Sequence, residues 1–193
     1  MSGAVIFWGL VAIVLIYAIF IYNALVQIKH NVSKAWSNID VLLKQRHDEL
    51  PKLVEACRQY KQFEQDTLRQ VTEARSRVQE ASQAQDIPAL SVAESALRVG
   101  LGQIFAVVEA YPELRANEHF AQLMQRVTSL EEGIADRREF YNESVNINNV
   151  RVEQFPDNLV ARLFSFGPRP LLTFKADDLK DVDVKALFAD ASK

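Results

Sequence analysis

Residues 4–22 read AVIFWGLVAIVLIYAIFIY, and no charged side chain occurs before Lys29. Twelve of these nineteen residues are Val, Ile, Leu or Phe. At a helical rise of about 1.5 Å per residue, about 20 apolar residues cross the hydrocarbon core of a bilayer. The run is apolar on every side, whereas a surface helix of a soluble protein keeps one polar face. The sequence therefore predicts an N-terminal transmembrane anchor over residues 1–28.

A cleaved signal peptide is the nearest alternative to an anchor. Residues 1–3 contain no Lys or Arg, the apolar run is longer than a signal peptide requires, and no cleavage site of the A-x-A type follows Tyr22. We therefore expect the segment to stay attached. Four basic residues lie between positions 29 and 46, so the positive-inside rule predicts a single-pass protein with its N-terminus outside and the rest in the cytoplasm.

Composition limits what the remaining residues can do. The net charge of −3 and the pI near 5.7 argue against a nucleic-acid-binding protein, which needs a clustered basic face. Cys57 is the only cysteine, so no intramolecular disulfide can form, and its place on an apolar helical stripe predicts a small core residue. We expect one helical-bundle domain over residues 29–174, followed by a tail over 175–193.

Helical periodicity dominates the chain after the anchor. Apolar residues recur every three or four positions from Val32 to Val78, from Leu90 to Val108 and from Phe120 to Val152. No turn signal separates Tyr22 from Val32, so the anchor is expected to continue directly into the first bundle helix. Pro51 predicts a kink near residues 47–50 or a brief break in that helix. The predicted fold is all-α: a transmembrane helix that continues into an antiparallel bundle of three long helices.

Local signals mark the ends of the predicted helices. Asp86 precedes Pro88 as a candidate N-cap, and the third helix is expected to start around Asn117. Small residues such as Gly100 would let a neighbouring helix approach the second helix closely. Asp157 or Asn158 is a candidate cap for a short extra helix through residue 163. The tail is interpreted either as mobile or as a short peptide that docks through Leu187 and Phe188.

Motifs of known enzymes were not found in the sequence. No nucleophile elbow, phosphate-binding loop or dinucleotide fingerprint is present, and the three histidines form no pair with metal-ligand spacing. We therefore predict no catalytic residue, no metal and no cofactor.

Several polar residues nonetheless call for an explanation as interaction or structural motifs. Arg46 and Asp48 lie at the expected kink, where Arg46 could donate to a backbone carbonyl or belong to a solvated charge cluster. Glu113 could favour the positive end of the third helix. Three asparagines share one face of that helix, which is either buried, where it would fix register, or solvated. The full candidate set is Arg46, Asp48, Tyr111, Pro112, Glu113, Asn117, Tyr141, Asn142, Asn146 and Asn149.

Six short strings occur in the order and spacing typical of one bacterial family. They are Tyr22-Asn23-x-Leu25-Val26, Ala35-Trp36-Ser37-Asn38-Ile39-Asp40, Arg46-His47-Asp48, Tyr111-Pro112-Glu113-Leu114-x-Ala116-Asn117, Arg138-x-Phe140-Tyr141-Asn142, and Phe155-Pro156-Asp157-Asn158-Leu159 followed by Ala161. The chain resembles the LemA family of bacterial membrane proteins over roughly residues 20–175. The resemblance implies a helical bundle anchored in the inner membrane, without an established catalytic activity. Members of the family are associated with a membrane zinc metallopeptidase through gene neighbourhood, and one relative is linked to magnetosome membranes, so the resemblance implies an accessory or scaffolding role.

The leading functional hypothesis is a non-enzymatic scaffold or adaptor that presents a helical face to a membrane-associated protein, with a metallopeptidase as one candidate partner. Self-association into a homo-oligomer would accompany this role. A protein that shapes the lipid bilayer, or senses its state, is the first alternative. A hydrolase is the second, and it requires carboxylates such as Asp48 and Glu113 to meet in a buried site.

Overall fold

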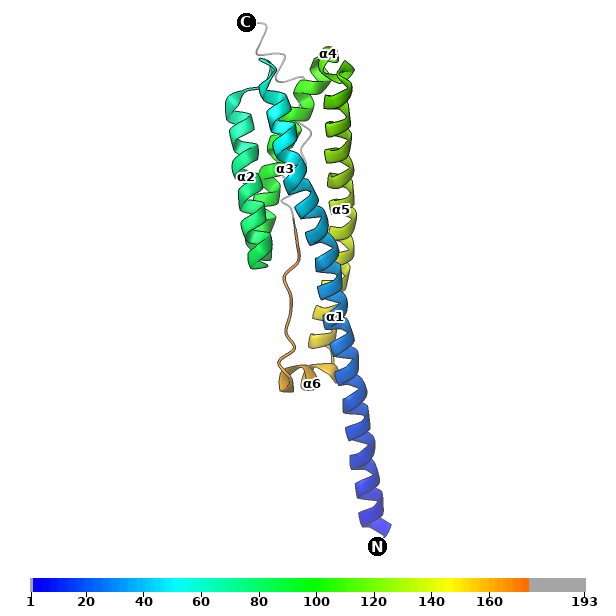
Figure 1. The fold of residues 1–193 in the computed structure, drawn as a ribbon. Helices are drawn as coiled ribbons and strands as arrows, with labels where there is room; N and C mark the ends of the chain where they lie inside the picture. Colours follow the sequence, from blue (N-terminus) through cyan, green and yellow to red (C-terminus); the bar gives the residue numbers. More distant parts are fainter. Residues whose placement is uncertain (1, 174–193) are drawn as a thin grey trace, which may run out of the picture. The chain divides into compact units, whose positions relative to one another are not determined.

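A computed structural model describes residues 2–173, and these residues form helices without any strand (Figure 1). The all-α prediction is confirmed. The predicted tail over 175–193 lies outside the described residues. In chain order the helices are α1 (Ser2–Arg58), α2 (Gln65–Ala84), α3 (Ile87–Ala110), α4 (Pro112–Ala116), α5 (Glu118–Glu153) and α6 (Asp157–Leu163).

The chain divides into two compact units, which we describe separately. Unit 1 comprises the described residues up to Leu42 together with 133–171. Unit 2 comprises residues 43–132 together with Leu172 and Thr173. Helices α1 and α5 each contribute a segment to both units. The predicted domain boundaries at residues 28 and 174 stay predictions.

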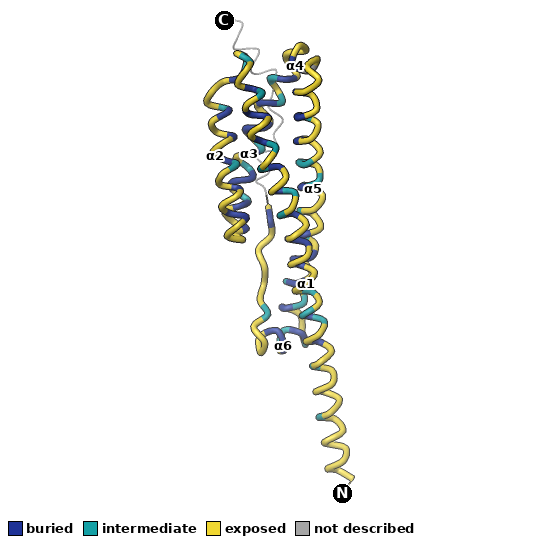
Figure 2. The backbone as a smooth tube through the Cα atoms, viewed as in Figure 1, coloured by how far each residue is buried: buried dark blue, intermediate teal, exposed yellow. Residues whose placement is uncertain are grey.

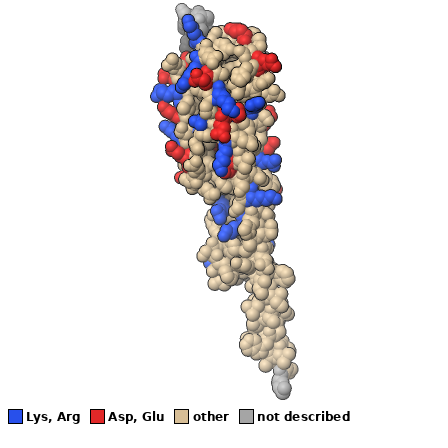
Figure 3. Space-filling model, viewed as in Figure 1, with Lys and Arg blue, Asp and Glu red and all other residues tan. Residues whose placement is uncertain are grey.

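Helix α1 runs without interruption from Ser2 to Arg58, as expected from the missing turn signal after Tyr22. Its first nineteen described residues are exposed, apart from the half-buried Val11 and Ala18 (Figure 2). Figure 3 shows no charged side chain along this stretch. This part of α1 is long and apolar enough to cross a membrane. The structure thus contains the predicted N-terminal apolar helix.

Helix α3 is the other described helix that is long and apolar enough to cross a membrane. Its apolar residues have a different explanation, because many of them are buried inside unit 2. Leu90, Leu97, Leu101 and Ile104 are at most 2% exposed. We therefore describe α3 as the core helix of this bundle.

Pro51 does not break α1, so the brief break expected there is wrong, whereas the kink expected near residues 47–50 stays a prediction. A proline inside a helix leaves the carbonyl of the residue four positions earlier without its usual donor. That carbonyl belongs to His47, and it accepts a hydrogen bond of 2.8 Å from Nε of Arg75 on α2. The donor predicted for such a freed carbonyl was Arg46, whose guanidinium points elsewhere. Arg75 thus supplies the donor that Pro51 lacks, so the proline is accommodated inside the helix.

The first bundle helix ends at Arg58, so the continuous helix predicted from Val32 to Val78 is wrong. Unit 2 therefore uses α2 as an additional long helix, and the described chain has four long helices instead of three. The reversal lies where Tyr60 and Phe63 pack their rings against Phe120, each at a centroid distance of 6.1 Å. Folding back lets the apolar stripe of α2 pack against α3. A continuous helix would have left that stripe in water.

Gly100 lies where α3 meets α2, as its small size predicted. A Cβ atom at this position would be 2.6 Å from Cγ2 of the buried Val71. The absence of a side chain therefore permits the close approach of the two helices.

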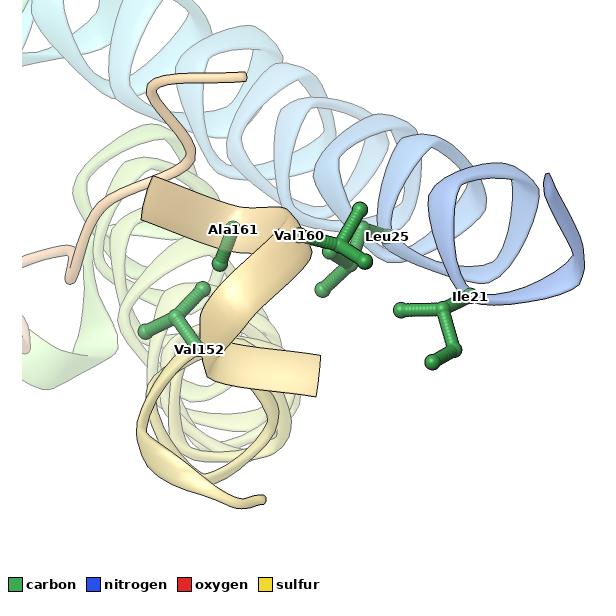
Figure 4. Close-up of a cluster of buried hydrophobic side chains, with 5 residues drawn as sticks. All are labelled: Ile21, Leu25, Val152, Val160 and Ala161. Atoms are coloured by element: carbon green, nitrogen blue, oxygen red, sulfur yellow. The ribbon is translucent and has the colours of Figure 1, made fainter. Parts of the chain in front are cut away.

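Unit 1 combines the first part of α1, the last part of α5, and α6. Its core contains a cluster of five buried apolar residues, shown in Figure 4: Ile21, Leu25, Val152, Val160 and Ala161. Helix α6 thus packs against α1 just where the apolar N-terminal run ends.

The predicted helix ends are confirmed in part. Oδ1 of Asp86 accepts from the backbone N–H of Ala89 at 3.0 Å, and Oδ1 of Asn117 accepts from that of Phe120 at 3.1 Å. The predicted cap at Asp157 or Asn158 is wrong, because α6 begins at Asp157 and both residues lie within it. The buried Asp157 instead forms an ion pair of 2.8 Å with Arg151. Burial of a carboxylate demands such a partner.

Candidate functional site

A buried ionic cluster joins three helices in unit 2. Arg46 on α1 is 1% exposed, and its Nη2 donates to Oε1 of Glu94 on α3, which is buried to the same extent. Its Nη1 donates to Oε1 of Glu131 on α5 at 2.6 Å. Oε2 of Glu131 lies 3.6 Å from Nε of Arg98. Two cations therefore face two carboxylates in a largely dry environment.

The electrostatics of this cluster hold Arg46 in its charged form. Burial alone would lower the pKa of Arg46, but the charges and hydrogen bonds of Glu94 and Glu131 outweigh it and raise that pKa above its ordinary value. A guanidinium that stays protonated cannot exchange protons with a substrate. The cluster is therefore suited to fixing helices relative to one another within unit 2, and it offers no acid–base chemistry through Arg46.

The interpretation of Arg46 as part of a solvated cluster at a bend is wrong. Its partner Glu94 was not singled out, although the sequence contained a usable signal. Glu94 occurs on the apolar stripe that includes Leu90, Leu97 and Leu101, so it is a carboxylate at a core position. A buried carboxylate requires a cation, and Arg46 is the corresponding charge on the stripe of α1.

A second polar contact involves His47, next to Arg46. Nε2 of its ring lies 2.6 Å from Nη2 of Arg75, whose Nε also donates to the His47 carbonyl. Since arginine can only donate, His47 accepts in its neutral form. Burial and the charge of Arg75 both lower the pKa of His47 below its usual value.

Asp48 and Glu113 do not form a buried site. Asp48 is exposed on α1, and Glu113 is exposed in the first turn of α4 instead of α5, so its predicted role at the start of the third helix is wrong. The hydrolase hypothesis loses the buried pair that it required. Tyr111 ends α3, and Pro112 occupies the first position of α4, where a missing N–H costs nothing.

Asn117 connects three parts of unit 2. While its Oδ1 caps α5, its Nδ2 donates to the hydroxyl of Tyr60 at 3.0 Å. Tyr60 in turn packs on Phe120. Asn117 therefore has a structural role in holding the α1–α2 reversal against the start of α5, at a place distinct from the partners of Arg46.

A set of hydrogen bonds in unit 1 holds the segment Gly167–Pro170, which we call the strap. Nδ2 and Oδ1 of Asn149 bind the carbonyl and the N–H of Arg169 at 2.9 and 2.8 Å. Nδ2 of Asn148 donates to the Gly167 carbonyl at 3.1 Å. The hydroxyl of Tyr141 donates to the Pro170 carbonyl at 3.3 Å. All three side chains come from α5.

The composition of the strap explains why amide side chains hold it. Pro168 and Pro170 have no N–H, so the strap can pair with a neighbour only through its carbonyls and the N–H groups of Gly167 and Arg169. An asparagine supplies one donor and one acceptor, which matches the peptide group of Arg169. Tyr141 is buried against Trp36 at a ring distance of 5.9 Å, and burial raises its pKa above the ordinary value.

The three asparagines predicted on one face have different environments. Asn142 and Asn149 are half-buried and Asn146 is exposed, so neither a wholly buried nor a wholly solvated face describes them. Sequence analysis singled out Asn149 but not Asn148, which lies on the apolar stripe from Phe120 to Val152. In the structure Asn148 is buried. Its burial serves the hydrogen bond to the strap.

Within residues 2–173, no group of three or more His, Cys, Asp or Glu side chains is placed to hold a metal ion.

Cys57 is fully buried, as predicted, and burial raises the pKa of its thiol to about 12.

A sequence model described as the LemA family matches residues 35–186 of the chain. The chain belongs to the LemA family. The matched range includes every residue of the candidate set, from Arg46 to Asn149. The buried ionic cluster and the strap contacts therefore both lie in the LemA region.

Two kinds of relative are similar to this LemA chain. Magnetosome protein MamQ 2 of Paramagnetospirillum magneticum is 23% identical over 168 residues, which cover 75% of this chain and 62% of the relative. Protein LemA of Metamycoplasma hominis is 26% identical over 163 residues, which cover 84% of this chain and 72% of the relative. The chain thus spans less than two thirds of the magnetosome protein. The N-terminal apolar helix together with these relatives indicates a membrane-associated protein.

Proposed function

We propose that this LemA protein is a membrane-anchored scaffold that presents the outward face of α3 to another membrane-associated protein. The observation that carries the proposal is the chemistry of that face. From residue 89 to residue 106 its exposed residues carry no charge, and all except Gln103 are small or apolar: Ala89, Val92, Ala96, Val99, Gly102 and Ala106. The first exposed charge is Glu109, in the last turn of α3. An apolar surface of this kind is a typical site of association with another protein.

The exposed surface of α2 provides a contrast within the same unit. Arg69, Glu73 and Arg77 are all exposed there, as expected for a face directed to water. The absence of exposed charge over most of α3 is therefore particular to this helix and is not shared by α2 in the same unit. Small side chains let a partner helix approach closely, as Gly100 does for α2 on the buried side.

The partner that fits this face is a protein with an apolar helical surface at the same membrane. A membrane metallopeptidase is one candidate, and a magnetosome-like membrane assembly is suggested by the MamQ relatives.

We further propose that the protein crosses the inner membrane with its N-terminus outside and its bundle in the cytoplasm, because basic residues follow the apolar run.

Photo-crosslinking in intact membranes tests the scaffold proposal. A benzophenone amino acid replaces Val92 or Val99 in the full-length protein, and Arg77 on α2 is the matched control position. Irradiation is expected to give a discrete heavier adduct at Val92 and Val99 but not at Arg77. The substitution Val92→Glu is expected to remove the adduct formed at Val99, because it introduces an unpaired charge into the contact.

Two results would contradict the proposal. Equal adduct yields at Val99 and Arg77 would show that α3 has no preferred partner. An adduct that contains only this chain would replace the adaptor role by self-association.

Labelling of single cysteines near each end of α1 with a membrane-impermeant maleimide, in intact and in opened cells, tests the proposed orientation.

A further inference from the structure

Helix α6 and the residues beside it expose large apolar side chains. Leu159 and Leu163 are 58% and 77% exposed and lie four residues apart, which places them on one side of the helix. Phe155, in the turn before α6, is 74% exposed. Phe164 follows at 52% exposure. The opposite side of α6 is buried through Val160 and Ala161 in the core of unit 1 (Figure 4). The helix is thus apolar on a face that no described part of the protein covers.

The position of α6 along α1 indicates what covers this face. The apolar run from Ala4 to Tyr22 is about 28 Å long at a helical rise of about 1.5 Å per residue, close to the thickness of a hydrocarbon core. Val160 and Ala161 cluster with Ile21 and Leu25, so α6 packs on α1 at the end of this run. The exposed face therefore lies at the level where acyl chains meet the headgroups.

Aromatic contacts fix the neighbouring residues at the same level. The ring of Tyr22 packs edge-on against Phe164 at 4.7 Å and against Phe166 at 5.8 Å. Aromatic rings are enriched at the membrane–water interface, where their apolar bodies and polar surroundings are both accommodated.

The charges around α6 suit an anionic lipid surface. The charged residues among the exposed positions of 155–171 are Arg162 and Arg169, because Asp157 is buried against Arg151. A groove of about 350 Å³ in unit 1 is lined by Arg169 together with Lys29, Tyr22 and Phe164. Long basic side chains beside an apolar surface can reach the phosphates while their stems stay in apolar surroundings.

We propose that α6 is an interfacial helix whose exposed Leu159 and Leu163, together with Phe155 before the helix and Phe164 after it, are embedded in the bilayer. In this arrangement Leu163 lies at the boundary of the acyl chains, and Arg162 and Arg169 contact anionic headgroups. The protein is then held to the membrane by two elements, the spanning part of α1 and α6. This inference is independent of the scaffold proposal, because it concerns a different unit and a different surface.

Site-directed spin labelling of the full-length protein tests the inference. Single cysteines replace Leu159 or Leu163 in a Cys57→Ala background, and the protein is reconstituted in vesicles of phosphatidylcholine and phosphatidylglycerol. Val14 in the apolar run is the lipid-exposed reference, and the exposed Ile147 on α5 is the water-exposed reference in the same unit. Helical content by circular dichroism confirms that each labelled protein is folded.

Power-saturation measurements with oxygen and with a water-soluble nickel chelate then distinguish three environments. Embedding predicts a ratio of oxygen to nickel accessibility at Leu163 that is several-fold higher than at Ile147 and approaches that at Val14. A ratio equal to that at Ile147 would place α6 in water and overturn the inference. Low accessibility to both reagents would show that a second copy of the chain covers the face, which would overturn it as well.

A charge substitution provides an independent readout. The substitution Leu163→Asp places an anion on the embedded face, whereas Arg162→Leu adds an apolar residue next to it. We expect Leu163→Asp to lower the oxygen accessibility of a label at Leu159 and Arg162→Leu to leave it high. No change with Leu163→Asp would contradict embedding.

Discussion

Nη1 of Arg46 lies 2.6 Å from Oε1 of Glu131, and this contact joins α1 to α5 inside unit 2. The same guanidinium reaches Glu94 on α3. One side chain thus determines how three helices are aligned in this unit. Because a guanidinium has a fixed geometry of donors, a helix that slid by one residue would lose at least one of these bonds.

Removal of the Arg46 charge should be strongly destabilising. The substitution Arg46→Met keeps much of the side-chain volume but leaves Glu94 buried without a cation, which costs about 3–5 kcal/mol. Urea unfolding of the protein in detergent, followed by circular dichroism, measures the loss. Arg58→Met is the matched control, because Arg58 forms an exposed pair with Glu55 and its loss should change the free energy of unfolding by less than about 0.5 kcal/mol.

The double variant Arg46→Met with Glu94→Leu separates charge from packing. It should recover part of the lost stability, since the carboxylate without a partner is then absent. If Arg46→Met is no more destabilising than Arg58→Met, the ionic cluster has no major structural role.

Stability should fall as pH drops through the range in which His47 titrates. The pKa of His47 is lower in the folded protein than the usual value of about 6.5, so the unfolded chain binds its proton first. The stabilising contribution of the neutral ring is present above about pH 6.5 and is lost as pH decreases below it. Unfolding measurements across this range should show the slope, and His47→Gln should reduce it. An unaltered slope in His47→Gln would assign the pH dependence to other groups.

Two glycines on α3 should respond in opposite ways to the same substitution. Gly102→Ala meets no atom within 4 Å and should stabilise the helix by about 0.5–1 kcal/mol. Gly100→Ala gains the same helical preference but forces its Cβ against Val71, which costs about 1–3 kcal/mol. Thermal unfolding of both variants should place Gly102→Ala above Gly100→Ala. The reverse order would show that α2 can move away without cost.

Cys57 should be chemically inert in the folded protein. With a pKa of about 12 and no exposed surface, its thiol is almost entirely protonated at pH 8 and inaccessible to reagents. A chromogenic disulfide should react with it only after unfolding. Ser76→Cys on the exposed side of α2 should react at once, and comparable rates at the two positions would contradict the burial.

Asn149 should control the local stability of the strap more than that of the whole protein. Asn149→Ala removes two hydrogen bonds to Arg169, at about 1 kcal/mol each. Hydrogen exchange of the Arg169 amide should accelerate strongly. Asn146→Ala, at an exposed position of the same helix, should leave this exchange rate unchanged. Equal effects of the two variants would show that the hydrogen bonds of Asn149 do not hold the strap.

The features set by local pattern could be predicted from the sequence. The N-terminal apolar helix, the helical class, the cap at Asp86 and the start of a long helix near Asn117 all depend on residues close together in the chain. The reversal after Arg58 could not be predicted this way, because no Gly or Pro marks residues 59–64. It depends on Phe120, a distant residue that receives the rings of Tyr60 and Phe63.

The candidate residues show the same division. Arg46 was correctly singled out, but its partners Glu94 and Glu131 lie 48 and 85 residues away. Asn149 was singled out as a face residue, whereas its actual function requires the position of Arg169. Sequence reasoning identified which side chains were unusual, and tertiary structure determined what they contact.

The strap also has a consequence for how this part of the chain can change over evolution. Tyr141, Asn148 and Asn149 bind only main-chain atoms of the strap, and every amino acid offers the same carbonyl. Descendants of this sequence could therefore exchange the strap's side chains while its path along α5 is inherited unaltered. For these hydrogen bonds, selection would act on three residues of α5, whereas in the strap it would require only that position 169 keep its N–H.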